Sequence, residues 1–314
     1  MIQDYDLSII IPHYQNAGDL QRLLASIPDN GRFETIVIDD YSDDDSFGQV
    51  LALKDKFRFE LIKNTGKKSA GTCRNRGLAQ ARGKWILFAD SDDFFLEPLE
   101  AEVYRHLDSD CDIVFFPPTS VYDDTFELAN RHLPHVSKLD AYLAAPSEMT
   151  EYALRLSWHC PWSKLYKLSF LKRHRISFDE VVAANDSIFS LVSGIKAVRI
   201  CVSTNSIYCA VSRKGSLQHS YNRKILESRI RVAVRHRKIC EALGYSDLGS
   251  KPLEFLYLAR YLSFCDCLYL VRLSKKLGVF NDFRFLRFAQ RSFMYFCSDK
   301  FESRKRKERL IVVK

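Results

Sequence analysis

The sequence predicts an α/β fold, in which strands and helices alternate and the strands share one sheet. The chain has 314 residues, of which 46% are hydrophobic and 27% charged. This composition is typical of soluble globular proteins and excludes collagen-like, low-complexity and largely disordered classes. Short apolar runs alternate with segments of helical periodicity through the first 116 residues, and acidic or aromatic residues directly follow several of those runs.

Five short apolar runs predict buried strands. Each is rich in β-branched or aromatic residues and is bounded by turn residues. The five runs are Leu7–Pro12, Glu34–Asp39, Phe59–Ile62, Trp85–Ala89 and Ile113–Phe116.

Four segments between these strands carry apolar residues at helical spacing. They are Asp19–Ile27, Ser46–Phe57, Ala70–Ala81 and Pro98–Leu107. Alternating strands and helices predict a parallel sheet covered by helices on both faces. Ligands of such sheets bind beyond the carboxyl ends of the strands, so the residues after each strand are the candidates for chemistry.

Acidic residues gather at these strand ends. Asp39 and Asp40 follow the second run, and Asp90, Asp92 and Asp93 follow the fourth. Crowded carboxylates repel one another, and a divalent cation with oxygen ligands would stabilise them. Because magnesium takes phosphate oxygens as further ligands, a phosphorylated metabolite is the expected co-ligand.

The alternative for such a stretch is a solvated loop that caps a helix. For Asp43–Asp45 we favour this alternative, with Ser42 and Asp45 as the capping candidates. For Asp90 and Asp92, which follow an apolar strand, we favour a functional role.

A basic segment, Lys67–Gly77, lies where a loop meets the third predicted helix. A helix N-terminus with nearby Lys and Arg side chains can hold a nucleotide phosphate, and the segment could also pair with the acidic edge. A basic first turn on a solvated helix is the alternative.

Together these motifs resemble those of the family 2 inverting glycosyltransferases, which have the GT-A fold. The resemblance covers residues 5–116 and continues more loosely to about residue 212. The motifs that carry it are Ile9–Asn16, Val37–Ser42, Gly71–Gly83 and Phe88–Asp93. The sequence departs from the family at His13, where a small hydroxyl residue is common, and at Tyr41, where Gly is common.

The resemblance implies roles for individual residues in binding the sugar donor. Arg74 would approach the base or the diphosphate, and Asp90 would meet the ribose. Asp92 would bind the metal, Mn²⁺ or Mg²⁺, that bridges the diphosphate. Three residues would line the nucleobase pocket: Pro12, Tyr14 and Asp40.

The resemblance also implies a catalytic base at the start of a later helix. In the family a Glu-Asp pair stands there and its Asp is the base; here the pair is Asn185-Asp186. The alternative is that one of these residues only caps the helix that begins at Ser187. Trp158 and Trp162 precede the base and could stack on an acceptor sugar, although aromatic residues more often belong to the core.

The resemblance therefore implies a metal-dependent inverting glycosyltransferase that uses a nucleotide-diphosphate sugar, most simply a UDP-sugar, to extend a surface polysaccharide or a lipid-linked glycan. A receiver-like signalling module or a phosphatase with an Asp-x-Asp nucleophile would also gather acidic residues. A receiver is typically shorter, and such a phosphatase carries its motif after the first strand, which here ends in Pro12-His13-Tyr14.

Charge divides the chain. Residues 1–150 have a net charge of −11 and residues 151–314 a net charge of +19. We expect a catalytic domain over 1–212 and a basic, mostly helical region over 213–314. The basic region suits an anionic membrane surface or a homodimer interface, and no nucleic-acid recognition motif occurs in it.

The sequence also bears on the compartment of the protein. No secretory signal opens the sequence, and charged residues interrupt the apolar stretch Leu253–Val271, so we expect no spanning helix. Nine Cys residues without a Cys-x-x-Cys motif predict free thiols in a reducing cytoplasm rather than disulfides or a zinc site. We therefore expect a cytoplasmic protein that associates peripherally with the inner face of the membrane.

Overall fold

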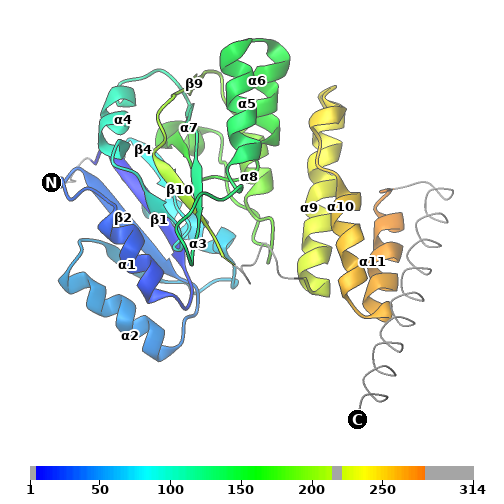
Figure 1. Ribbon diagram of the computed structural model, residues 1–314, viewed down its shortest axis with the longest axis horizontal. Coiled ribbons are helices and arrows are strands. Elements are labelled where there is room, and N and C mark those ends of the chain that lie inside the picture. The colour runs from blue at the N-terminus through cyan, green and yellow to red at the C-terminus, as the bar shows by residue number, and fades with distance from the viewer. Residues whose placement is uncertain (1–4, 214–220, 280–314) are drawn as a thin grey trace. The chain divides into compact units, whose positions relative to one another are not determined.

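A seven-stranded sheet forms the centre of the first part of the chain (Figure 1). The computed structural model describes residues 5–213 and 221–279, and it divides into two units, residues 1–216 and 217–314. The strands of the sheet are β1 (Leu7–His13), β2 (Phe33–Asp39), β3 (Glu60–Lys63), β4 (Trp85–Phe88), β6 (Ile113–Phe115), β8 (Lys164–Lys167) and β9 (Ile200–Val202). Their order is β3-β2-β1-β4-β8-β6-β9.

This sheet is mixed, which corrects the prediction of a parallel one. β3, β2, β1 and β4 are parallel neighbours, as predicted. β8 enters between β4 and β6 and runs antiparallel to both. Because of this reversal, the amino end of β8 lies beside the carboxyl ends of β4 and β6, at the edge where ligands are expected.

A second sheet of three short strands lies in the same unit. Its strands are β5 (Phe94–Phe95), β7 (Thr119–Tyr122) and β10 (Tyr208–Ser212), in the order β5-β10-β7. β5 follows the acidic residues after β4, so this small sheet joins the end of the unit to the acidic loop.

Helices flank the large sheet (Figure 1). They are α1 (Ala17–Ala25), α2 (Asp44–Ala52), η1 (Leu53–Asp55), α3 (Ala70–Gln80), α4 (Leu99–His106), α5 (Leu133–Ala144), α6 (Glu148–Ser157), α7 (Leu168–Arg173) and α8 (Ser187–Lys196). All four predicted helices are present within a few residues of their expected bounds.

Local sequence explains where several helices begin. The side chain of Asn16 accepts a hydrogen bond from Asp19 N at the start of α1, and the side chain of Ser69 accepts one from Thr72 N at the start of α3. The loop at 43–45 caps α2, as favoured from the sequence, but the capping residue is Asp43 instead of Ser42 or Asp45. Asp43 accepts from Ser46 N because the spacing of three residues suits an N-cap.

The core of this unit lies on β1 and the strands beside it. Every residue of β1 and β2 is buried, whereas the edge strand β3 is partly exposed. α3 packs closely on β1 and β2 because residue 77 has no side chain. A Cβ at Gly77 would lie only 2.4 Å from Ile10 Cγ2 and 2.9 Å from Ile38 Cδ1. Glycine at position 77 thus sets the depth of the helix that carries the basic segment.

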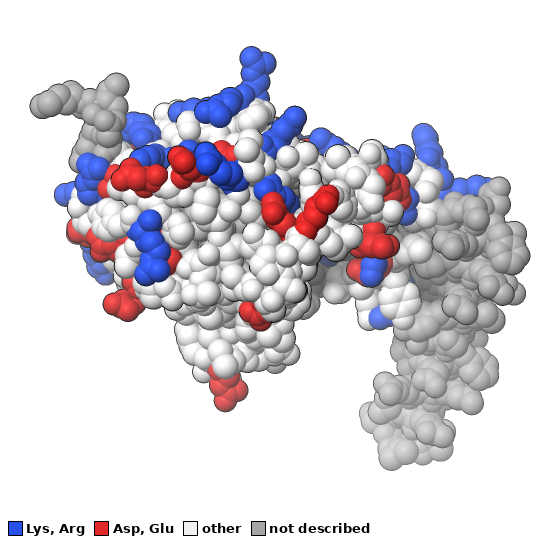
Figure 2. Space-filling view, turned by 90° about the horizontal axis from the view of Figure 1, so that it is seen from above, with Lys and Arg blue, Asp and Glu red and all other residues white. Residues whose placement is uncertain are grey.

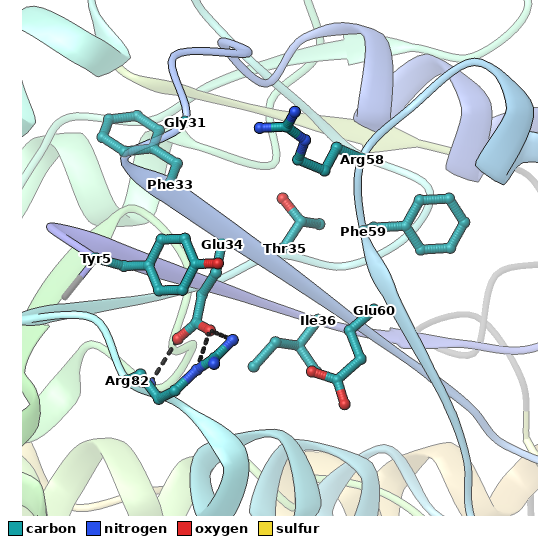
Figure 3. Close-up of a pocket in the computed structure, with 10 residues that line it drawn as sticks. All are labelled: Tyr5, Gly31, Phe33, Glu34, Thr35, Ile36, Arg58, Phe59, Glu60 and Arg82. Carbon is teal, nitrogen blue, oxygen red and sulfur yellow. Dashed lines mark hydrogen bonds and ion pairs between the residues drawn. The ribbon is translucent and has the colours of Figure 1, made fainter. Parts of the chain in front are cut away.

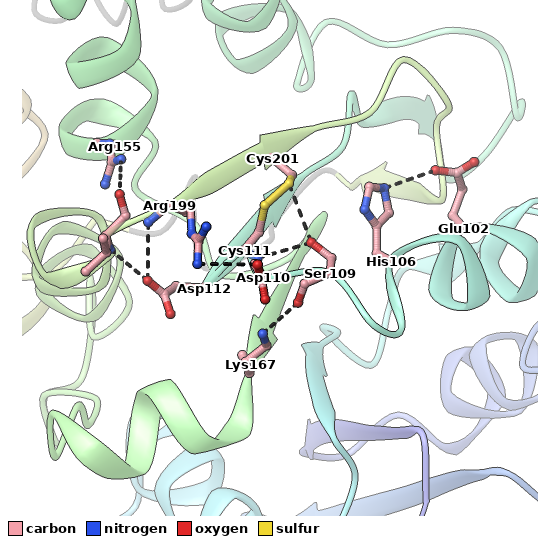
Figure 4. Close-up of a disulfide and its surroundings, with 11 residues drawn as sticks. Glu102, His106, Ser109, Asp110, Cys111, Asp112, Arg155, Lys167, Arg199 and Cys201 are labelled. Atoms are coloured by element: carbon pink, nitrogen blue, oxygen red, sulfur yellow. Dashed lines mark hydrogen bonds and ion pairs between the residues drawn. A yellow bond between two sulfur atoms is a disulfide. The ribbon is translucent and has the colours of Figure 1, made fainter.

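A disulfide joins Cys111 to Cys201, which corrects the prediction of free thiols for these two residues (Figure 4). Cys201 lies in β9 and Cys111 lies just before β6, and these strands are parallel neighbours. Their Cα atoms are 5.9 Å apart, a separation that suits a disulfide. The two residues are 90 positions apart in sequence, so only the folded sheet brings them together. The other Cys residues of the described chain are free: Cys73, Cys160, Cys209, Cys240, Cys265 and Cys267.

The second unit is helical over its described residues. It contains α9 (Arg223–Ala242), η3 (Ser246–Leu248), α10 (Pro252–Tyr257), η4 (Leu258–Tyr261) and α11 (Phe264–Lys276). Leu226, Ile230, Leu256 and Leu270 are among the residues of its own core. None of the described helices has the length and apolar composition needed to cross a membrane.

The aromatic and basic stretch on which a membrane contact was partly predicted lies outside the described residues. It comprises Phe280, Phe283, Phe285, Phe288, Phe293, Tyr295, Phe296 and the basic segment 303–313. On the described surface, Lys and Arg side chains lie interspersed with Asp and Glu side chains on the face shown in Figure 2.

Candidate active site

Three acidic side chains meet at the carboxyl end of β4. Asp90, Asp92 and Asp93 each offer a carboxylate oxygen, and these oxygens lie within 4.8 Å of one another. Asp90 and Asp92 are partly exposed, whereas Asp93 is fully buried. Burial, followed by the charge of Asp90, raises the pKa of Asp92. A cation bound here would relieve that repulsion.

Asp93 has a supporting role within this group. Its Oδ2 accepts a hydrogen bond of 2.6 Å from the Tyr208 hydroxyl, and its Oδ1 accepts one of 2.7 Å from Val211 N. Arg131 Nη1 lies 3.6 Å from Asp93 Oδ1. Burial raises the pKa of Asp93 well above its usual value, and the charge of Arg131 opposes that shift. Asp93 therefore anchors the acidic loop to β10.

Asp92 differs from its neighbours because its carboxylate forms no ion pair with any described residue. Its backbone is fixed instead, since Arg22 Nη2 donates to the Asp92 carbonyl oxygen at 2.6 Å. A partly exposed carboxylate on a fixed backbone, beside two other carboxylates, fits a hard divalent cation such as Mg²⁺ or Mn²⁺.

Arg74 connects the acidic loop to the start of α8. Its Nη2 donates to Asp90 Oδ1 at 2.6 Å, and its Nη1 donates to Asn185 Oδ1 at 2.7 Å. A Cβ at Gly71 would lie 2.3 Å from the carbonyl oxygen of Asp179 and 3.0 Å from Asn185 Cβ. Glycine thus allows the first turn of α3 to approach the segment before α8, and one arginine then bridges two parts of the site that are far apart in sequence.

Asp186, the predicted base, is the N-cap residue of α8, but its side chain makes no capping hydrogen bond. Asn185 does not cap the helix through its Oδ1 either, because that oxygen accepts from Arg74. Burial raises the pKa of Asp186, Arg74 lowers it, and Asp90 raises it again. The carboxyl group of Asp186 therefore lies within electrostatic reach of the acidic loop and is not used as a cap.

The three residues predicted for the nucleobase pocket lie at the carboxyl ends of β1 and β2. Pro12 is buried in β1, and Tyr14, just after that strand, is 49% exposed. Lys68 Nζ lies 3.7 Å from the centre of the Tyr14 ring. Asp40 is buried and accepts a hydrogen bond of 2.8 Å from Asn64 Nδ2.

Tyr41 takes an uncommon conformation next to this group. Its φ is +63°, in the left-handed region that favours glycine, and its hydroxyl donates to the Gly66 carbonyl oxygen at 2.7 Å. Glycine is common at this position in the resembled family, and the conformation explains that preference.

The two predicted acceptor residues are almost wholly buried. Trp158 is 1% exposed and packs on Phe115, and Trp162 is 4% exposed and stacks on Tyr208. This packing corresponds to the core alternative considered from the sequence. Trp162 still borders the site, because the Arg131 guanidinium lies 5.6 Å from its ring centre.

Sequence reasoning missed three residues that hold the acidic loop: Arg22, Arg131 and Tyr208. None lies in a recognised motif. Arg131 follows β7 in an irregular segment, and Tyr208 opens a strand 118 positions from the Asp90 backbone that it contacts. Only the three-stranded sheet brings Tyr208 to the acidic loop, so no local sequence signal could identify it.

A cavity of about 370 Å³ lies away from these residues (Figure 3). Phe33, Glu34 and Thr35, at the amino end of β2, line part of it, and Arg82 pairs with Glu34 in its wall. Because it adjoins the amino ends of the strands, it is separate from the candidate site.

Comparisons with known proteins identify the family of the chain. The model of glycosyl transferase family 2 matches residues 8–172. The poly(ribitol-phosphate) beta-N-acetylglucosaminyltransferase TarS of Staphylococcus aureus is 26% identical over 216 residues, which are 66% of this chain and 36% of TarS. The putative glycosyltransferase EpsH of Bacillus subtilis is 25% identical over 234 residues, which are 71% of this chain and 65% of EpsH. The chain thus spans little more than a third of the length of TarS.

Solved structures show the same fold. TarS of Staphylococcus aureus in complex with UDP-GlcNAc aligns with a TM-score of 0.59 and 23% identity, covering 84% of this chain and 75% of that one. The mannosyltransferase PcManGT from Pyrobaculum calidifontis, in complex with GDP-Man and Mn²⁺, aligns with a TM-score of 0.54 and 15% identity, covering 96% of this chain and 88% of that one. The prediction of a GT-A fold is confirmed.

Proposed function

The chain belongs to glycosyl transferase family 2, and from this membership we propose that it transfers a sugar from a nucleotide-diphosphate donor, of the UDP-sugar type, to a hydroxyl group of a glycan or lipid-linked acceptor in polysaccharide biosynthesis. The UDP-GlcNAc bound to TarS supports the donor class. Membership in this family also argues against the signalling and phosphatase alternatives.

One observation carries the proposal. Arg74 joins Asp90 of the acidic loop to Asn185, the neighbour of Asp186, through hydrogen bonds of 2.6 and 2.7 Å. A donor-binding group and a candidate base therefore belong to one connected arrangement. A transferase needs both groups, whereas a site that only binds a nucleotide has no use for the second.

In the proposed reaction, Asp186 removes the proton from the acceptor hydroxyl while the oxygen of that hydroxyl attacks the anomeric carbon from the face opposite the leaving group. The new glycosidic bond forms as the bond to the diphosphate breaks, so the configuration inverts. Asp92 would hold Mn²⁺ or Mg²⁺, which would offset the charge on the departing diphosphate, and Asp90 beside it would meet the ribose of the donor. The Mn²⁺ in PcManGT supports this cofactor.

Pro12, Tyr14 and Asp40 would bind the nucleobase in this proposal. All candidate donor and catalytic residues precede residue 212, so we propose 1–212 as the catalytic domain. Both tryptophans predicted to contact the acceptor are buried, so the proposal assigns no residue to acceptor binding.

We further propose that the basic region 213–314 holds the enzyme on an anionic membrane surface. The net charge of +15 over residues 213–314 supports this placement. Sedimentation with vesicles containing anionic lipid tests it. We expect the protein to sediment with the vesicles and high salt to abolish this binding. A stable dimer that does not bind vesicles would instead indicate that the basic region forms a homodimer interface.

The central test is titration of the full chain with nucleoside diphosphates and their sugar conjugates, with and without Mn²⁺, followed by a donor-hydrolysis and transfer assay. Metal-dependent binding of a uridine nucleotide is expected. Metal-independent binding, or binding of no nucleotide by folded protein, would contradict the proposal.

A further inference from the structure

Lys164 is a buried lysine that the proposed reaction does not use. It lies in β8 and is 2% exposed. Lysine is almost never fully buried without a partner of opposite charge, because removing an ammonium group from water is costly. Among the described residues, however, Lys164 forms no ion pair with a carboxylate. Its Nζ donates instead to the Trp158 carbonyl oxygen, at 3.1 Å.

Aromatic rings surround this ammonium group. Lys164 Nζ lies 5.2 Å from the ring centre of Phe115, 5.5 Å from that of Trp158 and 6.0 Å from that of Tyr166. The faces of aromatic rings attract cations, and this attraction is stronger away from water. The enclosure thus offsets part of the cost of burying this ammonium group.

The position of Lys164 in the sheet places this charge near the candidate active site. Lys164 pairs with Phe115, the last residue of β6. Because β8 runs antiparallel, Lys164 is at the edge of the sheet that also holds Asp90 and Asp92. β8 packs against α8, the helix that Asp186 precedes: the ring centres of Tyr166 and Phe189 lie 5.3 Å apart, and Ser187 Oγ lies 3.4 Å from His159 Nδ1. Burial and Arg74 are the larger influences on the pKa of Asp186, and Lys164 adds a smaller lowering of that pKa.

We propose that Lys164 is a positioning residue whose buried ammonium group keeps the Asp186 carboxyl ionised and ready to accept the proton of the acceptor hydroxyl. This inference rests on the proposed function. The proton moves from the acceptor oxygen to Asp186, and Lys164 neither gives nor takes it.

Other charged and titratable groups also shift the pKa values of Lys164 and Asp186, so a test must distinguish the effect of Lys164 from theirs. Burial lowers the pKa of Lys164 to about 7, while Cys160 and Asp186 raise it. Burial and nearby cations, Lys164 among them, lower the pKa of His135 well below its usual value, so His135 is neutral at pH 7. The groups that interact electrostatically with Lys164 or Asp186 are Cys160, His135, Tyr166, Arg74 and Asp90.

The first experiment compares pH profiles of kcat/KM. In Lys164→Met, which keeps much of the side-chain volume but loses the charge, the acid limb should move up by about one pH unit, because an opposite charge nearby lowers a carboxyl pKa. Lys164→Arg keeps the charge, so the acid limb of its profile should lie close to that of the unsubstituted protein. Donor affinity should change little in either variant.

Lys167→Met is a matched control. Lys167 lies in the same strand, donates to a backbone carbonyl at 2.6 Å and lies 5.4 Å from the Trp85 ring centre. It resembles Lys164 in these contacts, but it is at the other end of β8. Its loss should leave the acid limb in place. An unmoved limb in Lys164→Met, or an equal movement in Lys167→Met, would overturn the proposal.

A second measurement needs neither activity nor a core variant. In full-length protein with ¹⁵N-labelled lysine, the Lys164 ammonium signal, assigned by its absence in Lys164→Arg, should titrate near pH 7. In Asp186→Asn the midpoint should fall, because the carboxylate that raises this pKa is gone. An identical midpoint in both proteins would refute the coupling. If the midpoint falls in Asp186→Asn but the unsubstituted protein shows no transferase activity, only the proposed function is refuted.

Discussion

Arg74 Nη2 lies 2.6 Å from Asp90 Oδ1, and the same guanidinium donates to Asn185 from its other terminal nitrogen. Arg74 is 4% exposed, so neither contact is a loose surface pair. A buried arginine with two fixed partners has little freedom to move. The acidic loop and the start of α8 are therefore held in one geometry before any donor arrives.

Replacing Arg74 should disrupt both parts of the site. We expect Arg74→Ala to reduce kcat/KM by about 100-fold, since it releases both Asp90 and Asn185 and a displacement of site groups by about 1 Å can cost about 10²-fold. Arg74→Lys should recover part of the activity, because an ammonium group can reach only one partner well. Steady-state kinetics with the donor found by titration would measure this. Unchanged kinetics in both variants would show that the bridge has no functional role.

The proposed roles of Asp92 and Asp186 predict opposite patterns in two variants. Asp92→Ala should abolish metal-dependent donor binding. Asp186→Asn should leave donor binding largely intact and reduce transfer by about 10²–10⁴-fold, the usual contribution of a general base. Calorimetry for binding and product formation for transfer separate the two effects. Equal losses of donor binding would contradict the division of roles.

The hydroxyl group of Tyr208 should contribute both to the stability of the protein and to donor binding. That hydroxyl donates to Asp93 Oδ2 at 2.6 Å and accepts from Asp90 N at 3.0 Å. Tyr208→Phe leaves the buried Asp93 Oδ2 without this donor, so we expect a stability loss of about 1–3 kcal/mol together with weaker Mn²⁺-dependent donor binding. Tyr104→Phe, at a residue that is 41% exposed, is the control. Denaturant melts and calorimetry would test both effects, and a Tyr208→Phe protein that matched the control would refute the anchoring role.

Local signals in the sequence accounted for much of the fold. β1 to β4 and α1 to α4 were predictable because each has its own periodicity and boundary residues, and the carboxyl ends of the strands pointed to Asp90 and Asp92. The reversal of β8 was not predictable, because a short strand such as Lys164–Lys167 carries no mark of its direction.

The contacts that hold the site were not predictable from the sequence either, because they join residues that are far apart in the chain. Arg131 and Tyr208 act on the acidic loop across long sequence separations, through the three-stranded sheet. The pairing of Cys111 with Cys201 depends on the register of β6 and β9, which no local pattern encodes. The expectation of free thiols therefore fails at Cys111 and Cys201, which the pairing of β6 with β9 brings together.

The disulfide leads to a stability prediction of its own. Cys201 lies in β9, an edge strand with β6 as its only neighbour in the sheet, so the bond fastens that edge (Figure 4). The bond closes a long loop, and replacing both residues in Cys111→Ser/Cys201→Ser should lower the free energy of unfolding by about 2–4 kcal/mol. Cys265→Ser, at an exposed free thiol, should have almost no effect. Denaturant unfolding under non-reducing conditions measures the difference, and peptide mapping after alkylation of the unreduced, denatured chain identifies the bonded pair. If Cys111 and Cys201 are both alkylated without reduction, the bond is absent in solution and the prediction fails; the contacts of Asp112 with Val198 N and Arg199 N would then remain to hold the start of β9.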